Sequence, residues 1–490
     1  MKLDRRTIPY RIVENGTRIV GIIIFSIVTS SAGSGSSGSG FFGLSVLVAL
    51  LTVGMAITIA WEYARFQRYS YELTSDTFDI HSGVLSRRDR EIPYERIQNV
   101  DISQNILQRF LDIAEVRLET AGGSGTEAQL RYVSTGEASR LQEAISRRKR
   151  GAGDEATETE SEEAVLFELS DREHVILGII SADLRLIGVL TVAISAFAPQ
   201  VASQLGPEFE LVSVLGPAVA LAGILLFWAA SGVLQIFRYY GFRLTRREDE
   251  LRYERGLLQR YSGTVPLSKV QTVTLRENVL ARALGYASLT IQTAGYAPGQ
   301  DGSRVESAVP VARRDRALAL ARDVEPFDDV EFTRPPGRAR MRYAVRYTLV
   351  VLGLTAALRV VHFFTDALPR WYLPLAALLV VPLAAHLTWK HRGYYVTDDH
   401  VVTRRGFWRR NTMVVPYDRV QTVFSSQTVF QRRRDLGTVT IDTAGSGGLG
   451  GGDAVAVDID AGVADRLRED VADRLQRSLR ARERVPATTD

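Results

Sequence analysis

Arginine is the residue type in this sequence with the clearest chemical potential, because a guanidinium group can bind a phosphate or a carboxylate through paired hydrogen bonds. The densest group surrounds one Gly-Phe-Trp turn and continues further along the chain: Arg404, Arg405, Phe407, Trp408, Arg409, Arg410, Arg433 and Arg434. Beside an anionic leaflet each basic residue contributes about 1 kcal/mol of attraction, and exposed aromatic rings can enter the headgroup layer. The group therefore predicts a lipid headgroup site; its alternative interpretation is a solvated basic surface.

Composition excludes most other kinds of site. The chain has no cysteine, which rules out disulfides, thiolate metal sites, iron–sulfur clusters and cysteine nucleophiles. It has only 6 histidines, and no two of them lie four apart beside a glutamate, as a zinc-hydrolase helix requires. We find no Walker sequence, no G-x-S-x-G elbow and no helically spaced carboxylate pair within an apolar hairpin. We therefore expect no enzyme activity, no metal ion and no cofactor.

Two weaker candidates have simpler interpretations. Gly33, Gly35 and Gly38 match G-x-G-x-x-G, but they lie in a Ser/Gly-rich turn rather than between a strand and a helix. Asp183 and Arg185 could form an intramembrane pair that marks a transport pathway. Residues two apart do not share a helical face, so an interfacial position is favoured for this pair.

Long apolar runs divide the 490 residues into membrane and polar parts. The chain is too long for one ordinary domain, and its mean hydropathy of −0.02 averages apolar blocks with very polar ones. Three runs are long enough to cross a bilayer as helices: Phe41 to Trp61, Leu211 to Phe237 and Trp371 to Trp389. Each has a weaker apolar partner upstream: Ile19 to Ser30, Leu186 to Ala198 and Tyr347 to Val361. The sequence therefore predicts three hairpins, and thus six transmembrane helices.

Flanking charges orient these hairpins. Arginines cluster before the first hairpin and after the first and second, whereas the turns inside the hairpins are uncharged, acidic or balanced. The positive-inside rule then predicts a multi-pass protein of the cytoplasmic membrane, with both termini and all three polar segments in the cytoplasm. A signal peptide is not expected, because residues 1–18 are polar and no small-residue cleavage pattern follows them.

The three polar segments repeat one pattern with constant spacing. A proline follows a glycine after 10 residues, a glutamine comes 5 later, and an arginine and a threonine lie 11 and 22 beyond the glutamine. In chain order the copies are Gly83, Pro93, Gln98, Arg109 and Thr120; Gly256, Pro266, Gln271, Arg282 and Thr293; and Gly406, Pro416, Gln421, Arg432 and Thr443. We expect these residues to maintain the fold. The alternative for the recurring basic residues, which include Arg96, Lys269 and Arg419, is phosphate binding.

Each copy combines strands with a final helix. Apolar residues alternate before the Thr of each TAG sequence, as in Val116, Leu118 and Thr120, and period two indicates a strand. The glycine sits between two short β-like runs, where a positive φ can close a hairpin. Helical segments are predicted to end the copies, at residues 135–148, 315–324 and 461–480.

This order of strands, the P-x-x-[RK]-[IV]-Q motif, TAG and a helix, attached to apolar hairpins, resembles the bacterial pleckstrin-homology-like, membrane-flanked domain family, in particular its long YdbT-type members with three modules. The resemblance implies an α+β multi-domain membrane protein. Each hairpin would be followed by a partly open PH-like β-barrel of about seven strands, capped by a C-terminal helix. The resemblance also implies a shorter YdbS-like membrane protein as partner.

The repeat and the linkers predict the domain boundaries. In order they are an N-terminal segment with hairpin 1 (1–68), module 1 (69–149), an acidic linker (150–170), hairpin 2 (171–238), module 2 (239–325), a Pro/Arg linker (326–340), hairpin 3 (341–391), module 3 (392–480) and a tail (481–490).

These patterns favour a non-enzymatic membrane protein whose modules bind anionic lipid headgroups or partner proteins at the membrane face. Three linked weak sites could act together by avidity. The alternative is a structural subunit of a membrane complex with the shorter partner. A transporter is disfavoured because the apolar runs carry almost no ionisable residue near their centres. Nucleic acid is not expected as a partner, since the other basic runs lack stacking aromatics.

Overall fold

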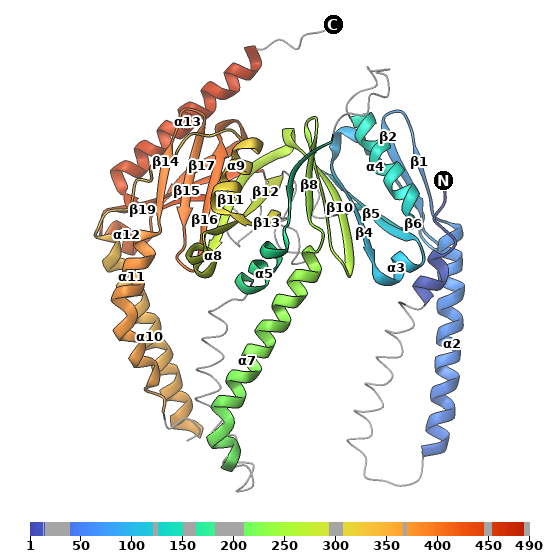
Figure 1. Cartoon of the computed structure of the whole chain (residues 1–490), viewed down its shortest axis with the longest axis horizontal. Coiled ribbons are helices and arrows are strands. Elements are labelled where there is room, and N and C mark those ends of the chain that lie inside the picture. The colour runs from blue at the N-terminus through green and yellow to red at the C-terminus, as the bar shows by residue number, and fades with distance from the viewer. Residues whose placement is uncertain are drawn as a thin grey trace. The chain divides into compact units, whose positions relative to one another are not determined.

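The computed structural model describes residues 1–12, 14, 40–120, 126–149, 163–181, 210–293, 307–365, 370–444 and 453–484 (Figure 1). The chain forms two compact units. Unit 1 comprises residues 1–162 together with 258–264, and unit 2 comprises residues 163–257 and 265–490. The predicted transmembrane segments 19–30 and 186–198 lie outside the described residues, as do Gly33, Gly35, Gly38, Asp183 and Arg185.

The three modules share one order of elements: three strands, a 3-10 turn, a fourth strand, a short helix, two strands and a final helix. Module 1 has β1 (Ser70–Leu73), β2 (Thr77–Ser82), β3 (Arg88–Pro93), η1 (Tyr94–Arg96), β4 (Ile97–Asn105), α3 (Ile106–Phe110), β5 (Ile113–Thr120), β6 (Thr126–Ser134) and α4 (Thr135–Lys149). Module 2 has β8 (Arg243–Arg247), β9 (Glu250–Arg255), β10 (Gln259–Pro266), η3 (Leu267–Lys269), β11 (Val270–Asn278), α8 (Val279–Leu284), β12 (Tyr286–Thr293), β13 (Ser307–Arg313) and α9 (Arg314–Val324). Module 3 has β14 (Gly393–Val396), β15 (His400–Arg405), β16 (Arg409–Pro416), η5 (Tyr417–Arg419), β17 (Val420–Ser426), α12 (Val429–Arg432), β18 (Leu436–Thr443), β19 (Ala454–Asp460) and α13 (Ala461–Arg484).

The repeated residues occupy equivalent places in these elements. The proline ends the third strand, and the glutamine is the second residue of the fourth strand. The arginine lies in the short helix, and the threonine ends the fifth strand. The glycine closes the turn before the third strand with φ of +117°, +104° and +92° at Gly83, Gly256 and Gly406, a region that L side chains rarely adopt.

Strands pair across module boundaries rather than closing within a module. In unit 1, residues 259–263 of β10 pair antiparallel with β4, which continues into β5 and β6. In unit 2, β16 pairs antiparallel with β11 in the order β13-β12-β11-β16-β15-β14. The third strand of one module therefore extends the sheet of the module before it.

The prediction of a separate barrel in each module is not supported, because the described sheets are open and each module contributes six strands. The third and fourth strands, which a barrel would keep in one wall, separate at the 3-10 turn and enter different sheets. This separation leaves backbone N–H and C=O groups unpaired along the fourth strand. In modules 1 and 2 the third strand of the following module pairs with these groups.

Each final helix covers the apolar face of its module through residues spaced three and four apart. In α4 these are Ala138, Leu141 and Ile145, which pack in one core with Phe78, Ile97, Val116 and Leu118. The corresponding residues are Ala317, Leu320 and Ala321 in α9, and Ala464, Leu467 and Val471 in α13.

Three helical segments of the described chain are long and apolar enough to cross a membrane: residues 221–239 of α7 (Glu210–Tyr239), α10 (Ala339–Thr365), and residues 373–390, which comprise η4 (Leu373–Val380) and α11 (Val381–Lys390). The helix α2 (Gly40–Gln67) contains the uncharged run that begins at Phe41. Pro374 and Pro382 lie in the first turns of η4 and α11, where a backbone N–H has no helical partner to lose. Figure 1 shows α10 and α11 side by side.

Two further elements precede module 2. The strand β7 (Ala164–Glu168) pairs with β8, and the helix α5 (Asp171–Ile180) begins with a capping box at Ser170 and Glu173. The helix α5 lies against α7.

Candidate functional site

The turn between β15 and β16 holds most of the predicted headgroup residues, and its backbone requires glycine. A Cβ on Gly406 would lie 2.1 Å from the carbonyl oxygen of Arg409, so any other residue would collide with the backbone. This tight turn joins Arg404 and Arg405 of β15 to Arg409 and Arg410 of β16, with Arg404 paired with Thr412 and Arg405 with Asn411.

The pleat of the sheet divides these four arginines between two faces, because successive side chains of a strand point to opposite sides. Arg404 and Arg410 share a face with Thr412, and both line a cavity there. Arg405 and Arg409 fall on the other face with Arg276 of β11, and their positive charges, after burial, lower the pKa of Arg276. The sequence grouped these residues as one site, whereas the structure separates them into two.

The cavity is enclosed by β11, β15, β16, α9 and the segment that follows α9, with a volume of about 290 Å³. Its charged lining consists of Arg314, Arg322, Arg404, Arg410, Glu277 and Asp329. Four guanidinium groups thus face two carboxylates. We call this the arginine cavity, and its excess of positive charge suits an anion.

Two of its arginines are already engaged by a buried carboxylate. Glu277 is 3% exposed, and its two carboxylate oxygens accept hydrogen bonds from Arg410 at 2.7 and 2.8 Å. Arg314 approaches the same carboxylate at 3.4 Å. Arg410 therefore joins β16 to β11, and its role is to hold the two modules together.

Arg404 is the arginine of this cavity with the most unmet capacity to bind an anion. Burial, and then the positive charges of Arg410 and Arg334, lower its pKa from 12.5 to about 10. Its guanidinium group stacks on the ring of Phe332 at 3.9 Å, which fixes its orientation. Its Nε is buried without a hydrogen-bond partner among the described residues. An anion in the cavity would offset the charge repulsion between Arg404 and its neighbouring arginines.

The aromatic residues of the turn lie beside the end of a candidate membrane helix. Trp408 is 48% exposed, and the Phe407 ring lies 5.4 Å from the ring of His391, one residue beyond α11. The guanidinium of Arg282 lies 5.3 Å from the Phe407 ring. Burial, and then nearby arginines, lower the pKa of His391 from 6.5 to about 4, so its imidazole is neutral near pH 7.

Arg433 and Arg434 do not join this site. They follow α12, where Arg433 is exposed and the carbonyl oxygen of Arg434 accepts a hydrogen bond of 2.8 Å from Arg338. Four further residues of the cavity are not predicted by the sequence pattern: Glu277, Arg314 and Arg322 of module 2, and Phe332 of the linker after it. The pairing of β16 with β11 brings these residues to the cavity, and no local sequence pattern predicts that pairing.

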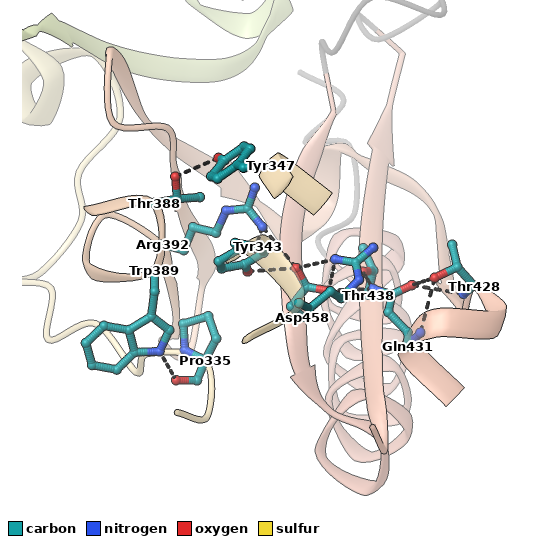
Figure 2. A network of polar contacts seen from close by, with 11 residues as sticks. Pro335, Tyr343, Tyr347, Thr388, Trp389, Arg392, Thr428, Gln431, Thr438 and Asp458 are labelled. Atoms are coloured by element: carbon teal, nitrogen blue, oxygen red, sulfur yellow. Dashed lines mark hydrogen bonds and ion pairs between the residues drawn. The ribbon is translucent and has the colours of Figure 1, made fainter. Parts of the chain in front are cut away.

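A buried polar network joins α10 to module 3, as Figure 2 shows. Asp458, which is fully buried in β19, accepts hydrogen bonds from Arg342 at 2.6 and 2.7 Å and from the Tyr343 hydroxyl at 2.7 Å. Arg392 and Gln431 donate to it at 3.0 and 2.7 Å. One carboxylate therefore connects three elements: α10, α12 and the segment that follows α11. This arrangement is structural rather than catalytic.

A related contact joins the N-terminal helical residues 7–12 to module 1. Asn105 and Gln108 donate to the Tyr10 hydroxyl at 2.6 and 3.2 Å, and Gln108 holds the same place in the repeat as Gln431. Arg11 pairs with Glu62 of α2 at 3.2 Å, with both side chains at least 90% buried. Among the described residues no group of three or more His, Asp or Glu side chains could hold a metal ion.

The apolar helices, the repeated order of six strands and the final helix of each module are consistent with a single protein family. The sequence matches the bacterial PH domain family over residues 22–149, 186–326 and 347–482, and the chain belongs to this family. It is similar to the UPF0699 transmembrane protein YdbT of Bacillus subtilis (strain 168), with 27% identity over 433 residues that cover 83% of this chain and 85% of that protein. No solved structure matches the chain. The chain is therefore a YdbT-like membrane protein with three bacterial PH repeats.

Proposed function

We propose that this protein is a non-enzymatic, multi-pass membrane protein that binds anionic lipid headgroups through the arginine cavity. The observation that carries the proposal is the state of Arg404, a half-buried cation with an unpaired Nε and neighbouring arginines that depress its pKa. Its strand turns at Gly406 beside the end of the candidate membrane helix α11, and this position supports a headgroup as the ligand of the cavity. The exposed Trp408 ring suits the headgroup layer.

The finer topology is part of the same proposal. Three hairpins and six transmembrane helices would place both termini and all three modules in the cytoplasm, as the flanking arginines favour. Since the chain has no cysteine, single cysteines report their side of the membrane without background. We expect Ser36→Cys to react with an impermeant thiol reagent added outside intact cells, and Arg433→Cys to react only after lysis. Labelling of Arg433→Cys from outside would overturn the orientation.

Binding is tested on the full chain in phosphatidylcholine nanodiscs, titrated with short-chain phosphatidylglycerol. Replacing Arg404 with glutamine should weaken binding about tenfold, the worth of one charge-assisted hydrogen bond. Arg433→Gln is the matched control, because it removes an exposed arginine outside the cavity. Equal affinities for Arg404→Gln and Arg433→Gln would remove the cavity from the proposal.

Two further titrations separate the possible sources of the phosphate. Short-chain phosphatidylcholine should bind weakly, because its headgroup carries no net charge. Inorganic phosphate should compete with phosphatidylglycerol only at much higher concentration if the acyl chains and Trp408 contribute to binding. If inorganic phosphate binds as tightly as the lipid, the ligand is a soluble anion and the headgroup proposal fails. The shorter YdbS-like partner stays a prediction.

A further inference from the structure

The two sheet junctions inside the chain follow one rule of register. Ser262 of β10 pairs with Ile102 of β4, and Thr412 of β16 pairs with Leu275 of β11. In both junctions the residue four before the repeated proline faces the residue four after the repeated glutamine. The fourth strand of a module is therefore a specific acceptor for the third strand of another module.

Among the described strands, none pairs with the acceptor strand of module 3 in this way. In the described structure β17 lies at the edge of the sheet β17-β18-β19, whereas β11 is covered by β16. The exposure of equivalent residues records the difference: Thr274 of β11 is 3% exposed, and Phe424 of β17 is 46% exposed. After Val420, no residue of β17 is buried.

The edge of β17 also carries no charged residue or proline to protect it, and its register shift between Val420 and Thr422 recurs between Val270 and Thr272 of β11, which β16 pairs with nevertheless. Its sequence from Gln421 to Ser426 is Gln-Thr-Val-Phe-Ser-Ser, without a charge or a proline. Free edges in native proteins usually carry charged residues, prolines or bulges, because an uncharged edge pairs readily with other strands. Such an unprotected edge at a position occupied twice elsewhere in the chain indicates a docking surface.

A second copy of this chain does not fit that surface through its own free third strand. The edge strand β3 reads Arg-Asp-Arg-Glu-Ile-Pro, and the same register would set Asp89 opposite Ser425 and Glu91 opposite Val423. In the existing junction those places are held by Thr412 and the buried Val414.

Charge makes this mismatch costly. The hydroxyl oxygen of Ser425 lies 3.5 Å from the Asp465 carboxylate of α13, so Asp89 would bring a second carboxylate close to the first. Glu91 would be buried against Val423, which packs on the core of module 3. The charges on β3 thus make it a poor partner for β17, whose edge stays uncovered in the described sheets.

We propose that β17 binds, by antiparallel strand addition, the third strand of a bacterial PH module on a different polypeptide. That strand carries uncharged residues two and four positions before its proline, as β16 does with Val414 and Thr412. The partner thereby continues the array that β10 and β16 build within the chain. This inference is independent of headgroup binding, because β17 contributes nothing to the arginine cavity.

Disulfide trapping on the full chain in nanodiscs tests the stated chemistry of the strand. Paired residues of antiparallel strands lie within disulfide distance, and the chain has no cysteine of its own. The full chain with Ser425→Cys is incubated in a glutathione buffer with a peptide of residues 407–416 that carries Cys in place of Thr412. A second peptide, of residues 84–93, carries Cys in place of Asp89.

We expect the β16 peptide to be trapped about tenfold more than the β3 peptide, because the β3 peptide still places the Glu91 carboxylate on the core side. The full chain with Leu275→Cys in place of Ser425→Cys should trap neither peptide, since β16 already pairs with β11. Retained slow hydrogen exchange in β18 for Ser425→Cys, and in β12 for Leu275→Cys, shows that the variants are folded. Equal trapping of the two peptides, or trapping at Leu275→Cys alone, would overturn the proposal.

The natural occupant is identified by a photoreactive residue in place of Phe424 in the full chain in its own cell membranes. A crosslink to the third strand of a bacterial PH module on another polypeptide supports the proposal. Crosslinks to β3 or β17 of a second copy, to lipid alone, or to no peptide contradict it. Adding Ser425→Glu should abolish the supporting crosslink, whereas Asp89→Ser on the other edge should leave it unchanged.

Discussion

Modules 1 and 3 place the same glutamine of the repeat in different chemical settings. Gln108 donates to the hydroxyl of Tyr10, and Gln431 donates to the carboxylate of Asp458. A buried hydroxyl needs only hydrogen bonds, but a buried carboxylate also needs positive charge, which Arg342 and Arg392 supply. The repeat therefore conserves a polar anchoring point while the chemistry around it changes.

Module 2 shows a third solution. Its short helix has the buried Ala281 where the other two have glutamine, and the side chain of Asn278 donates instead to the carbonyl oxygen of Ile180 in α5. Backbone recognition replaces side-chain recognition here. The difference predicts that replacing the polar anchoring residues will weaken module 3 most, because its anchor depends on a single buried charge, that of Asp458.

The largest effect is expected for Asp458→Asn. Asparagine tolerates the positive φ of +60° at this position, so the variant removes charge with little change of shape. Arg342 and Arg392 would lose their buried counter-ion, and module 3 should lose about 3 to 5 kcal/mol of stability. Hydrogen exchange of β18 and β19 amides in nanodiscs measures this loss, with β5 and β6 as the internal control. Unchanged exchange would show that the network contributes nothing to anchoring.

A smaller loss is expected in module 1 for Glu62→Gln, which leaves Arg11 buried with a neutral partner. The pair between Arg11 and Glu62 is broken, and Arg11 keeps its 2.8 Å hydrogen bond to the carbonyl oxygen of Arg131, so we expect about 2 to 3 kcal/mol. Hydrogen exchange of β5 and β6 reports it. The double variant Arg11→Met with Glu62→Met should recover most of the stability, because it removes both buried charges. A double variant less stable than Glu62→Gln would contradict this account.

The matched pair Gln431→Ala and Gln108→Ala sharpens the comparison. Each variant removes one donor from a buried acceptor, at a cost of about 1 to 2 kcal/mol, with the carboxylate partner giving the larger value. Thermal unfolding of the full chain in detergent, with hydrogen exchange measured separately for each module, shows which variant loses more stability. If Gln108→Ala were the more damaging, the charge on Asp458 would not strengthen the anchor.

The smallest effect concerns pH and His391. Because the pKa of His391 lies at about 4 in the folded protein and near 6.5 when the chain is unfolded, the unfolded state binds more protons between these values. Stability should therefore fall as the pH drops from about 6.5 to 4. His391→Asn should flatten this part of the profile of unfolding against pH. An identical profile for the variant would assign the pH dependence to other groups.

The repeat was visible in the sequence because its spacing is local. The proline, the glutamine and the threonine mark the ends and starts of strands through backbone geometry, which a short stretch of chain determines. The apolar run from Tyr347 to Val361 lies within α10 despite Arg359, since its length and hydropathy suffice. The arginine site was harder to predict from the sequence. The pleat places Arg404 and Arg405 on different faces, and the cavity is completed by Glu277 and Arg314 of another module.

The sequence by itself determined the family, the three repeats and the apolar helices, because each depends on spacing and hydropathy within a continuous segment. Only the tertiary structure decided which strands pair. The third strands of modules 2 and 3 each have two possible neighbours, their own fourth strand or that of the module before. The register and the packing of side chains from both modules select between them, and this selection forms the arginine cavity and leaves β17 uncovered.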